Sequence, residues 1–212
     1  MAKFRKPPFD TAEVAALLQP LMRSAPRNTQ IELAYGAAVP VLELAEAIEM
    51  WRLDGDKIPG ARSIEQAAVR LGRWYHQIRA QGKPVAHATS VETGPFGGAP
   101  QVASVVHEDA LARQVDAAID IIDRDKRLDD AVEVRMVAVP SYHLTALWLV
   151  GPGIAGVAVL PGVTSDRAET RISIEHLSII GEENFLSRLK AAGPLGGFSI
   201  DPEPDGSPQL SR

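Results

Sequence analysis

Apolar side chains recur at helical spacing in two segments near the start of the chain. The first follows Asp10 and Glu13, which have the spacing of a capping box, and its apolar positions are Val14, Leu17, Leu18 and Leu21. We expect Pro20 to bend or end this helix. The second segment follows Pro40, with apolar positions at Val41, Leu44, Ala45, Ile48 and Trp51 and with Glu43, Glu46 and Glu49 on the solvent side. Both patterns predict helices, and residues 30–39 between them fit either a short strand or a connector.

Residues 63–81 fit two different structures. Ser63 and Gln66 have capping-box spacing, and apolar residues continue at helical spacing to Ile78, which fits one helix ending at Gln81. Alternatively, Gly72 ends the helix and a strand follows at 73–81, because Trp, Tyr and Ile suit strands and an interior glycine costs a helix about 1 kcal/mol. We favour the strand, since Gly82-Lys83 then makes a two-residue turn with glycine first and residues 84–92 form the returning strand.

The later part of the chain has mostly strand patterns. Residues 101–106 alternate as a strand, and further strands are expected at 131–139, 143–150 and 154–160. The last three are separated by short connections, which favour antiparallel pairing between successive strands.

Two helices are expected among these strands. The clearer one covers residues 108–124, with a buried stripe at Leu111, Val115, Ala118, Ile119 and Ile122, and the other covers 182–192. The pattern predicts an α+β fold in which a mainly antiparallel sheet of about five to six strands, between residues 73 and 161, is packed by the 108–124 helix. Helices at the N-terminus and a short helix near the C-terminus complete it.

Length and chain ends predict one domain. The 212 residues suit a single globular unit, which we place at 10–192, between a flexible N-terminal arm at 1–9 and a flexible tail at 193–212. The arm is positively charged and no apolar segment follows it, so we expect no secretory signal and a cytoplasmic protein. The excess of arginine over lysine and the many alanines are typical of bacterial proteins from GC-rich genomes.

Composition excludes several classes of protein. The hydrophobic content of 45% is too high for a disordered chain, and the apolar runs are too short to span a membrane. The chain has no cysteine, which excludes thiolate metal sites and cysteine nucleophiles. The formal net charge of −5 argues against a broad nucleic-acid surface. We therefore predict neither a nucleic-acid nor a membrane partner.

Residues 151–156 match the pattern G-x-G-x-x-G that is typical of dinucleotide sites. Such a site needs a helix directly after the glycines, because the pyrophosphate binds at the N-terminus of that helix. Residues 157–160 have a strand pattern instead, and Pro161-Gly162 follows. We therefore predict a hairpin turn here and no bound cofactor.

Three aspartates, Asp116, Asp120 and Asp123, lie along one side of the 108–124 helix. Carboxylates so placed can bind a hard cation, but Arg113 and Arg124 are close enough along the helix to pair with them. We therefore predict a solvated helix face and no metal site.

Two histidines form the candidate catalytic pair. If Gly82-Lys83 is the turn, His76 lies opposite Thr89 and His87 lies opposite Ile78, which makes the imidazoles diagonal neighbours with Cβ atoms about 7–8 Å apart. Such a pair can share a metal, or one imidazole can act as a base while the other holds a substrate. In the helical alternative for 73–81 the pair does not form.

Four other residues are candidates for binding. Trp74 and Thr89 share the predicted face of the histidines, and Tyr142 and His143 lie on the most apolar hairpin. Because no complete catalytic set is visible and both ends carry apolar residues, we predict a non-enzymatic interaction or assembly protein that binds a protein partner or a second copy. The alternative is a small hydrolase or lyase that uses His76 and His87 in a cleft between sheet and helices.

Overall fold

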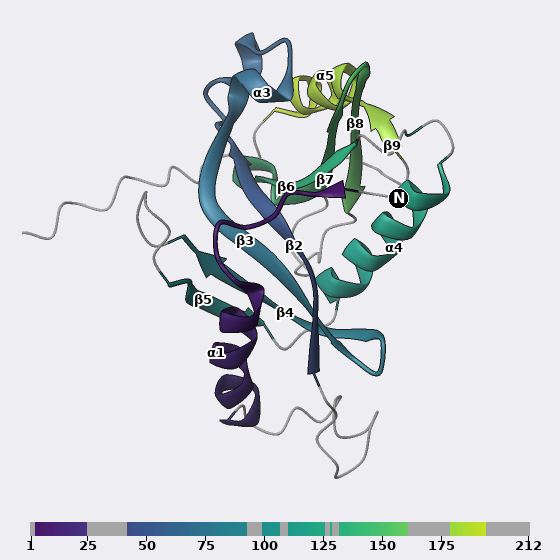
Figure 1. Cartoon of the computed structure of the whole chain (residues 1–212). Coiled ribbons are helices and arrows are strands. Elements are labelled where there is room, and N and C mark those ends of the chain that lie inside the picture. Colours follow the sequence, from purple (N-terminus) through teal and green to yellow (C-terminus); the bar gives the residue numbers. More distant parts are fainter. Residues whose placement is uncertain are drawn as a thin grey trace, which may run out of the picture.

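The computed structural model describes residues 3–24, 42–92, 99–106, 110–125, 128, 132–160 and 179–193. In chain order, the strands are β1 (Lys3–Phe4), β2 (Leu42–Leu53), β3 (Ala68–Ala80), β4 (Lys83–Val91), β5 (Gln101–Val106), β6 (Glu133–Val139), β7 (Leu144–Gly151), β8 (Ile154–Leu160) and β9 (Ile179–Gly181). The helices are α1 (Thr11–Ser24), α3 (Ile64–Ala67), α4 (Ala110–Arg124) and α5 (Glu182–Ala192), with 3-10 turns at Ile58–Gly60 and Pro140–Tyr142 (Figure 1).

All the described strands belong to one nine-stranded mixed sheet. The order is β5-β4-β3-β2-β6-β7-β8-β9, and β1 pairs with β6 outside that path. Strands β2 to β5 form one antiparallel meander and β6 to β9 form another, and the parallel pair of β2 and β6 joins them. The predicted α+β class with a largely antiparallel sheet is confirmed. The sheet is larger than predicted, and it includes the parallel pairs β1–β6 and β2–β6.

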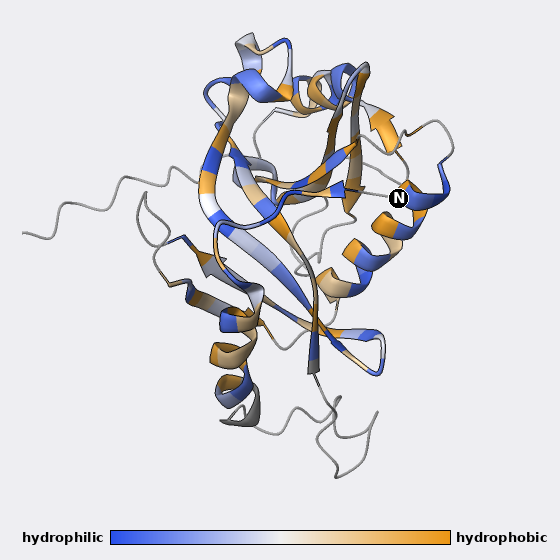
Figure 2. Cartoon of the chain, viewed as in Figure 1, coloured by the Kyte–Doolittle hydropathy of each residue, from blue (hydrophilic) through white to orange (hydrophobic). Residues whose placement is uncertain are grey.

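Helix α4 covers one face of this sheet, which we call the α4 face. Figure 2 shows apolar and polar residues alternating along α4, as expected of a helix with one buried side. Its buried residues Val115, Ala118 and Ile122 pack against a cluster that includes Tyr75 of β3 and Met136 of β6. The stripe predicted for residues 108–124 therefore faces the core, although the helix is described only from Ala110 onward.

Helices α1 and α5 cover the opposite face, which we call the α1 face. Val14 and Leu18 of α1 pack over Ile78 of β3 and its neighbours on β4. At the other end of this face, Phe185, Leu186 and Leu189 of α5 pack over β6, β7 and β8. Helix α1 begins after Asp10, whose carboxylate accepts a hydrogen bond from the Ala12 N–H (2.9 Å), and it continues past Pro20 to Ser24 instead of ending there.

Strand β2 replaces the helix predicted for residues 41–51, and that prediction is wrong. The strand is covered on both faces, because Ala47 lies opposite His76 on the α1 face and Ile48 lies opposite Tyr75 on the α4 face. A β-bulge between Leu44 and Ala47 also interrupts the two-residue alternation, which leaves apolar residues at helical spacing. Glu49, predicted on the solvent side, is only 1% exposed.

The other predicted elements mostly agree with the structure. Residues 73–81 belong to β3 up to Ala80, so the favoured strand is confirmed and the single helix to Gln81 is wrong. The helix expected to end at Gly72 ends at Ala67 instead, because β3 already begins at Ala68. The strands predicted after residue 100 are β5 to β8, and the helix predicted at 182–192 is α5. Residues 30–39 and most of the predicted tail, 194–212, lie outside the described residues.

Candidate functional site

A groove of 640 Å³ lies on the α1 face, between the N-terminal arm and strand β2. We define the arm as residues 3–10. Arm residues and Thr11 of α1 form the walls of the groove, and Leu44, Ala45 and Ala47 of β2 form its floor. The β-bulge of β2 lies in this floor. Natural ligand sites have volumes of roughly 300–1,000 Å³, so the groove has the size of a binding site.

The arm is attached to the sheet at three points. Its first two residues form β1 and pair in parallel with Glu133 and Val134 of β6. Arg5 Nη1 donates hydrogen bonds to both carboxylate oxygens of Glu49, at 3.2 and 3.3 Å. Phe9 packs against the rings of Trp74 and His76, with centroids 6.1 and 6.3 Å apart. The segment predicted as a flexible arm thus crosses the sheet and closes one side of the groove.

The arm passes over a network of charged side chains at Arg5. Glu49 of β2 accepts hydrogen bonds from Arg5, from Arg70 Nε and from Trp51 Nε1 (3.1 Å). Arg70 of β3 also binds Glu92 through both terminal guanidinium nitrogens. Arg70 therefore joins the two carboxylates, and β2, β3 and the residue after β4 are linked by ion pairs.

Glu49 stays ionised although its side chain is buried. Its side chain is fully buried, which alone would raise the pKa of the carboxyl group. The hydrogen bonds from Arg70 and Trp51 and the charges of Arg5 and Arg70 outweigh burial and lower this pKa below its ordinary value. The same contacts with Glu49 raise the pKa of Arg70. Glu49 is therefore a carboxylate in the folded protein at neutral pH.

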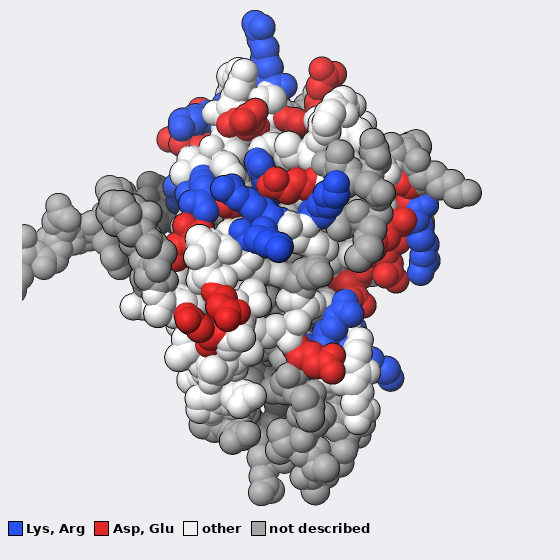
Figure 3. All heavy atoms as spheres, in the orientation of Figure 1, with Lys and Arg blue, Asp and Glu red and all other residues white. Residues whose placement is uncertain are grey.

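All three tryptophans of the chain lie in this region. Trp74 Nε1 donates a hydrogen bond to Glu92 (2.8 Å), and Trp51 packs edge-on against Trp148 at 5.9 Å. The Arg135 guanidinium lies over the rings of both Trp51 and Trp148, at 4.9 and 5.0 Å. Figure 3 shows basic side chains gathered across the middle of this face, with acidic side chains among them.

Gly72 explains how Arg70 comes to lie beside Glu49. Along the β2–β3 pair, Met50 lies opposite Arg73 but the next residue, Trp51, lies opposite Arg70, so β3 has two extra residues there. Gly72 is one of them and has a φ of +61°, a conformation that glycine adopts without strain. Its carbonyl accepts a hydrogen bond from the Glu92 N–H (2.9 Å), which fixes the second carboxylate near Arg70.

Replacing Gly72 with alanine is expected to destabilise the protein by about 1 kcal/mol, because alanine is strained at a positive φ. Urea unfolding at pH 7 measures the change. Gly60→Ala is the matched control, since Gly60 has open space around it and no positive φ, and it should be close to neutral. Equal losses in the two variants would contradict this role of Gly72.

The structure does not bring the two predicted catalytic histidines together. His76 lies opposite Ala88 and His87 lies opposite Gln77, so the predicted register is wrong by one residue. Because neighbouring residues of a strand point to opposite faces, this difference places the two imidazoles on opposite sides of the sheet. His76 lies on the α1 face under Phe9, whereas His87 stacks on Tyr75, at 5.3 Å, on the α4 face.

The turn geometry accounts for the change in register. Gln81 and Gly82 both have a positive φ, 50° and 75°, which is typical of a type I′ turn, so Ala80 pairs with Lys83. This turn alone moves the pairing by two residues from the predicted register, and a β-bulge between Ile78 and Arg79 moves it back by one, which leaves the net difference of one residue. The sequence favoured Gly82-Lys83 as the turn because a type II′ turn has glycine in first place, whereas the observed turn has Gln81 at a positive φ, which is uncommon for glutamine.

His76 is a buried neutral side chain. It is 0% exposed, and its Nε2 lies 2.7 Å from Ser90 Oγ, which is also buried. Burial lowers the pKa of His76 to about 4, so the imidazole is uncharged at neutral pH. Its Nδ1 has no hydrogen-bond partner among the described residues.

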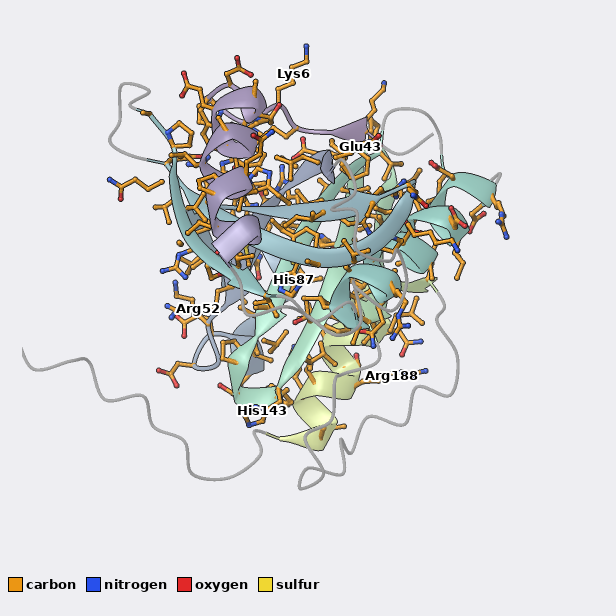
Figure 4. All side chains as sticks on the ribbon, turned by 90° about the horizontal axis from the view of Figure 1, so that it is seen from below. Lys6, Glu43, Arg52, His87, His143 and Arg188 are labelled. Atoms are coloured by element: carbon orange, nitrogen blue, oxygen red, sulfur yellow. The ribbon has the colours of Figure 1, made fainter. Side chains whose placement is uncertain are left out.

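The four predicted binding residues are likewise dispersed. Trp74 is fully buried under Phe9, and Thr89, on the opposite face of the hairpin, is bonded to Ser104 (2.7 Å). Tyr142 is buried and donates a hydrogen bond to the Leu189 carbonyl (2.9 Å). His143 is exposed, and Figure 4 shows it at the far end of the fold from Lys6.

The glycine pattern at residues 151–156 and the aspartates of α4 both lie among the described residues. Gly151 and Ile154 pair across the turn between β7 and β8, so residues 151–156 form a hairpin. Asp116 forms an ion pair with Arg79 and Asp120 forms one with Arg124. Among the described residues, no three histidine or acidic side chains come together as possible metal ligands.

Sequence patterns gave no sign of the groove or of the charged network. Arg5, Glu49, Arg70 and Glu92 come from segments far apart in the chain, and no local motif links them. Comparison with protein-family models, with curated proteins and with solved structures finds no match to this chain. None of the described helices has the length and apolar content needed to cross a membrane.

Proposed function

We propose that this protein is an interaction protein whose groove binds an extended segment of a partner polypeptide. The observation that carries the proposal is that, among the described residues, the second edge of β2 beside the groove has no strand partner over residues 42–49. β2 pairs with β3 along its whole length, but with β6 only at Met50, Trp51 and Arg52. From residue 42 to 49, no other described strand pairs with the second edge of β2.

An open strand edge offers main-chain donors and acceptors to an extended peptide. Peptides added in this way gain affinity from main-chain hydrogen bonds and specificity from pockets for alternate side chains. Ala45 and Ala47 supply small apolar surfaces at this edge, and Leu44 and the arm residue Phe9 supply larger ones. Main-chain and apolar groups thus lie together, as binding of a polypeptide requires.

The alternative of a hydrolase that uses His76 and His87 has less support. A shared site requires both imidazoles at one surface, and the strand register separates them across the sheet. The pKa of His76, about 4, would also leave it a weak base at neutral pH.

A groove-filling substitution tests the proposal. A library of random heptapeptides is panned on the protein, and the enriched peptides are measured against Ala45→Trp, in which the indole occupies the floor of the groove. We expect the enriched peptides to lose at least roughly tenfold in affinity, because a filled groove excludes them.

Ala191→Trp is the matched control, because Ala191 is exposed on α5, outside the residues that line the groove. It should bind the enriched peptides as the native protein does, and both variants should unfold at a urea concentration close to that of the native protein. Enriched peptides that bind Ala45→Trp with unchanged affinity would overturn the proposal.

A further inference from the structure

The arm places two lysines at the rim of the groove. Lys3 and Lys6 are both exposed and both line the groove, and neither forms an ion pair with any residue that the structure describes. Lys6 projects outward beside α1 (Figure 4). Lys3 lies in β1, and Lys6 lies three residues further along the arm.

The other charges of the groove already have partners. Arg5 is bound to Glu49 through both carboxylate oxygens, so these two charges offset one another. Asp10 accepts a hydrogen bond from the Ala12 N–H at the beginning of α1, where the helix dipole favours a negative charge. Among the described residues that line the groove, the two lysines are therefore the cations left to bind a ligand, in a chain whose formal net charge is −5.

We propose that the polypeptide segment bound by the groove is acidic, with carboxylates bound by Lys3 and Lys6 and apolar side chains between them. This inference rests on the proposed function and names the chemistry of its partner. The long flexible side chains of lysine let the ammonium groups reach carboxylates two residues apart in an extended peptide, about 7 Å. Phe9 and Leu44 also line the groove and are only partly buried, so they suit the apolar residues of the same peptide.

Three synthetic peptides on one apolar frame test the inference. They are the acidic Glu-Val-Glu-Leu-Glu-Val-Glu, its lysine counterpart and a neutral Ser/Thr counterpart, each labelled with a fluorophore and titrated with the full chain by fluorescence anisotropy. We expect the acidic peptide to bind at least about tenfold more tightly than the neutral one, and the basic peptide to bind least. Raising the salt concentration should narrow these differences.

Reversing the charge of a groove lysine tests whether the acidic peptide binds at that lysine. Lys6→Glu should raise the Kd of the acidic peptide about tenfold and leave that of the neutral peptide nearly unchanged. Lys83→Glu is the matched control, because Lys83 is also exposed but lies at the β3–β4 turn, away from the groove lining, and it should change neither Kd.

The outcomes separate this inference from the proposed function. Neutral and acidic peptides that bind equally well, and that Ala45→Trp excludes, would overturn the acidic partner while leaving the groove as a polypeptide site. Equal losses in Lys6→Glu and Lys83→Glu would also overturn it, because the attraction would then come from the overall charge. If Ala45→Trp binds every peptide as the native protein does, the groove itself is excluded.

Discussion

Arg70→Met is expected to lower the free energy of unfolding by about 2 kcal/mol at pH 7, less than for a fully buried pair because the Arg70 side chain is 37% exposed. The substitution keeps an unbranched apolar side chain but removes the guanidinium that binds both Glu49 and Glu92. Glu49 is fully buried, so its carboxylate then keeps only Trp51 and the half-exposed Arg5 as partners. Removing one member of a buried ion pair is costly because the other charge remains buried without full compensation.

Urea unfolding at pH 7 measures this loss, and Arg52→Met is the matched control. Arg52 is exposed on the same strand as Glu49, and Figure 4 shows it at the periphery of the fold. The control should change stability by less than about 0.5 kcal/mol. Adding Glu49→Gln to Arg70→Met should recover part of the loss, because an uncharged amide needs less compensation. If Arg70→Met and Arg52→Met cost the same, the network does not stabilise the fold.

The effect of Arg70→Met should also depend on pH. The native contacts lower the pKa of Glu49, so the stability they confer is present above the ordinary pKa of 4.5 and is lost as the pH falls through the lowered value. Without Arg70, burial outweighs the remaining contacts and the carboxyl group takes up a proton at a higher pH. The difference in free energy of unfolding between the native protein and the variant should therefore shrink as the pH is lowered from 7 to about 4. A difference that stays constant over this range would contradict the assignment.

Local patterns predicted the later part of the fold well. β6, β7 and β8 have one face in each core cluster and are joined by short connections, so their alternation is visible in the sequence. Helix α4 has a clear apolar stripe because one side packs on the sheet and the other meets solvent. These elements follow from residues that are neighbours in the chain, which is why sequence analysis finds them.

The candidate site depends on contacts that local patterns do not show. β2 lacks clear alternation of apolar and polar residues because it is buried on both faces and contains a bulge. Its apolar residues recur at helical spacing instead, and the helix predicted from them placed Glu49 on the solvent side, whereas Glu49 is buried. The histidine pair depended on a register that two irregularities changed, a turn with Gln81 at a positive φ and a bulge beside Arg79. The arm contacts β2 and β6 where the two meanders meet, through residues far from it in the chain, so no pattern within residues 1–9 indicates its path.

His76 is expected to make the fold unusually sensitive to mild acid. Its pKa in the folded protein is about 4, whereas an unfolded chain has the ordinary value of 6.5. Below pH 6.5 the unfolded chain therefore binds a proton that the folded protein does not, and stability falls as the pH drops toward 4. For these two pKa values the loss between pH 7 and pH 5 is about 2 kcal/mol.

His76→Gln should remove this loss, because glutamine does not titrate. Its side chain can still bond to the buried Ser90 hydroxyl, so the variant should fold at pH 7 with a moderate loss of stability. Urea unfolding from pH 7 to pH 5 gives the slope, and this range lies above the ordinary pKa values of carboxyl groups. His143→Gln is the control, since His143 is exposed, and it should keep the native slope. If His76→Gln and the native protein show the same slope of stability against pH, His76 is protonated in the folded native protein in mild acid. Phe9 of the arm would then have to leave its place over His76.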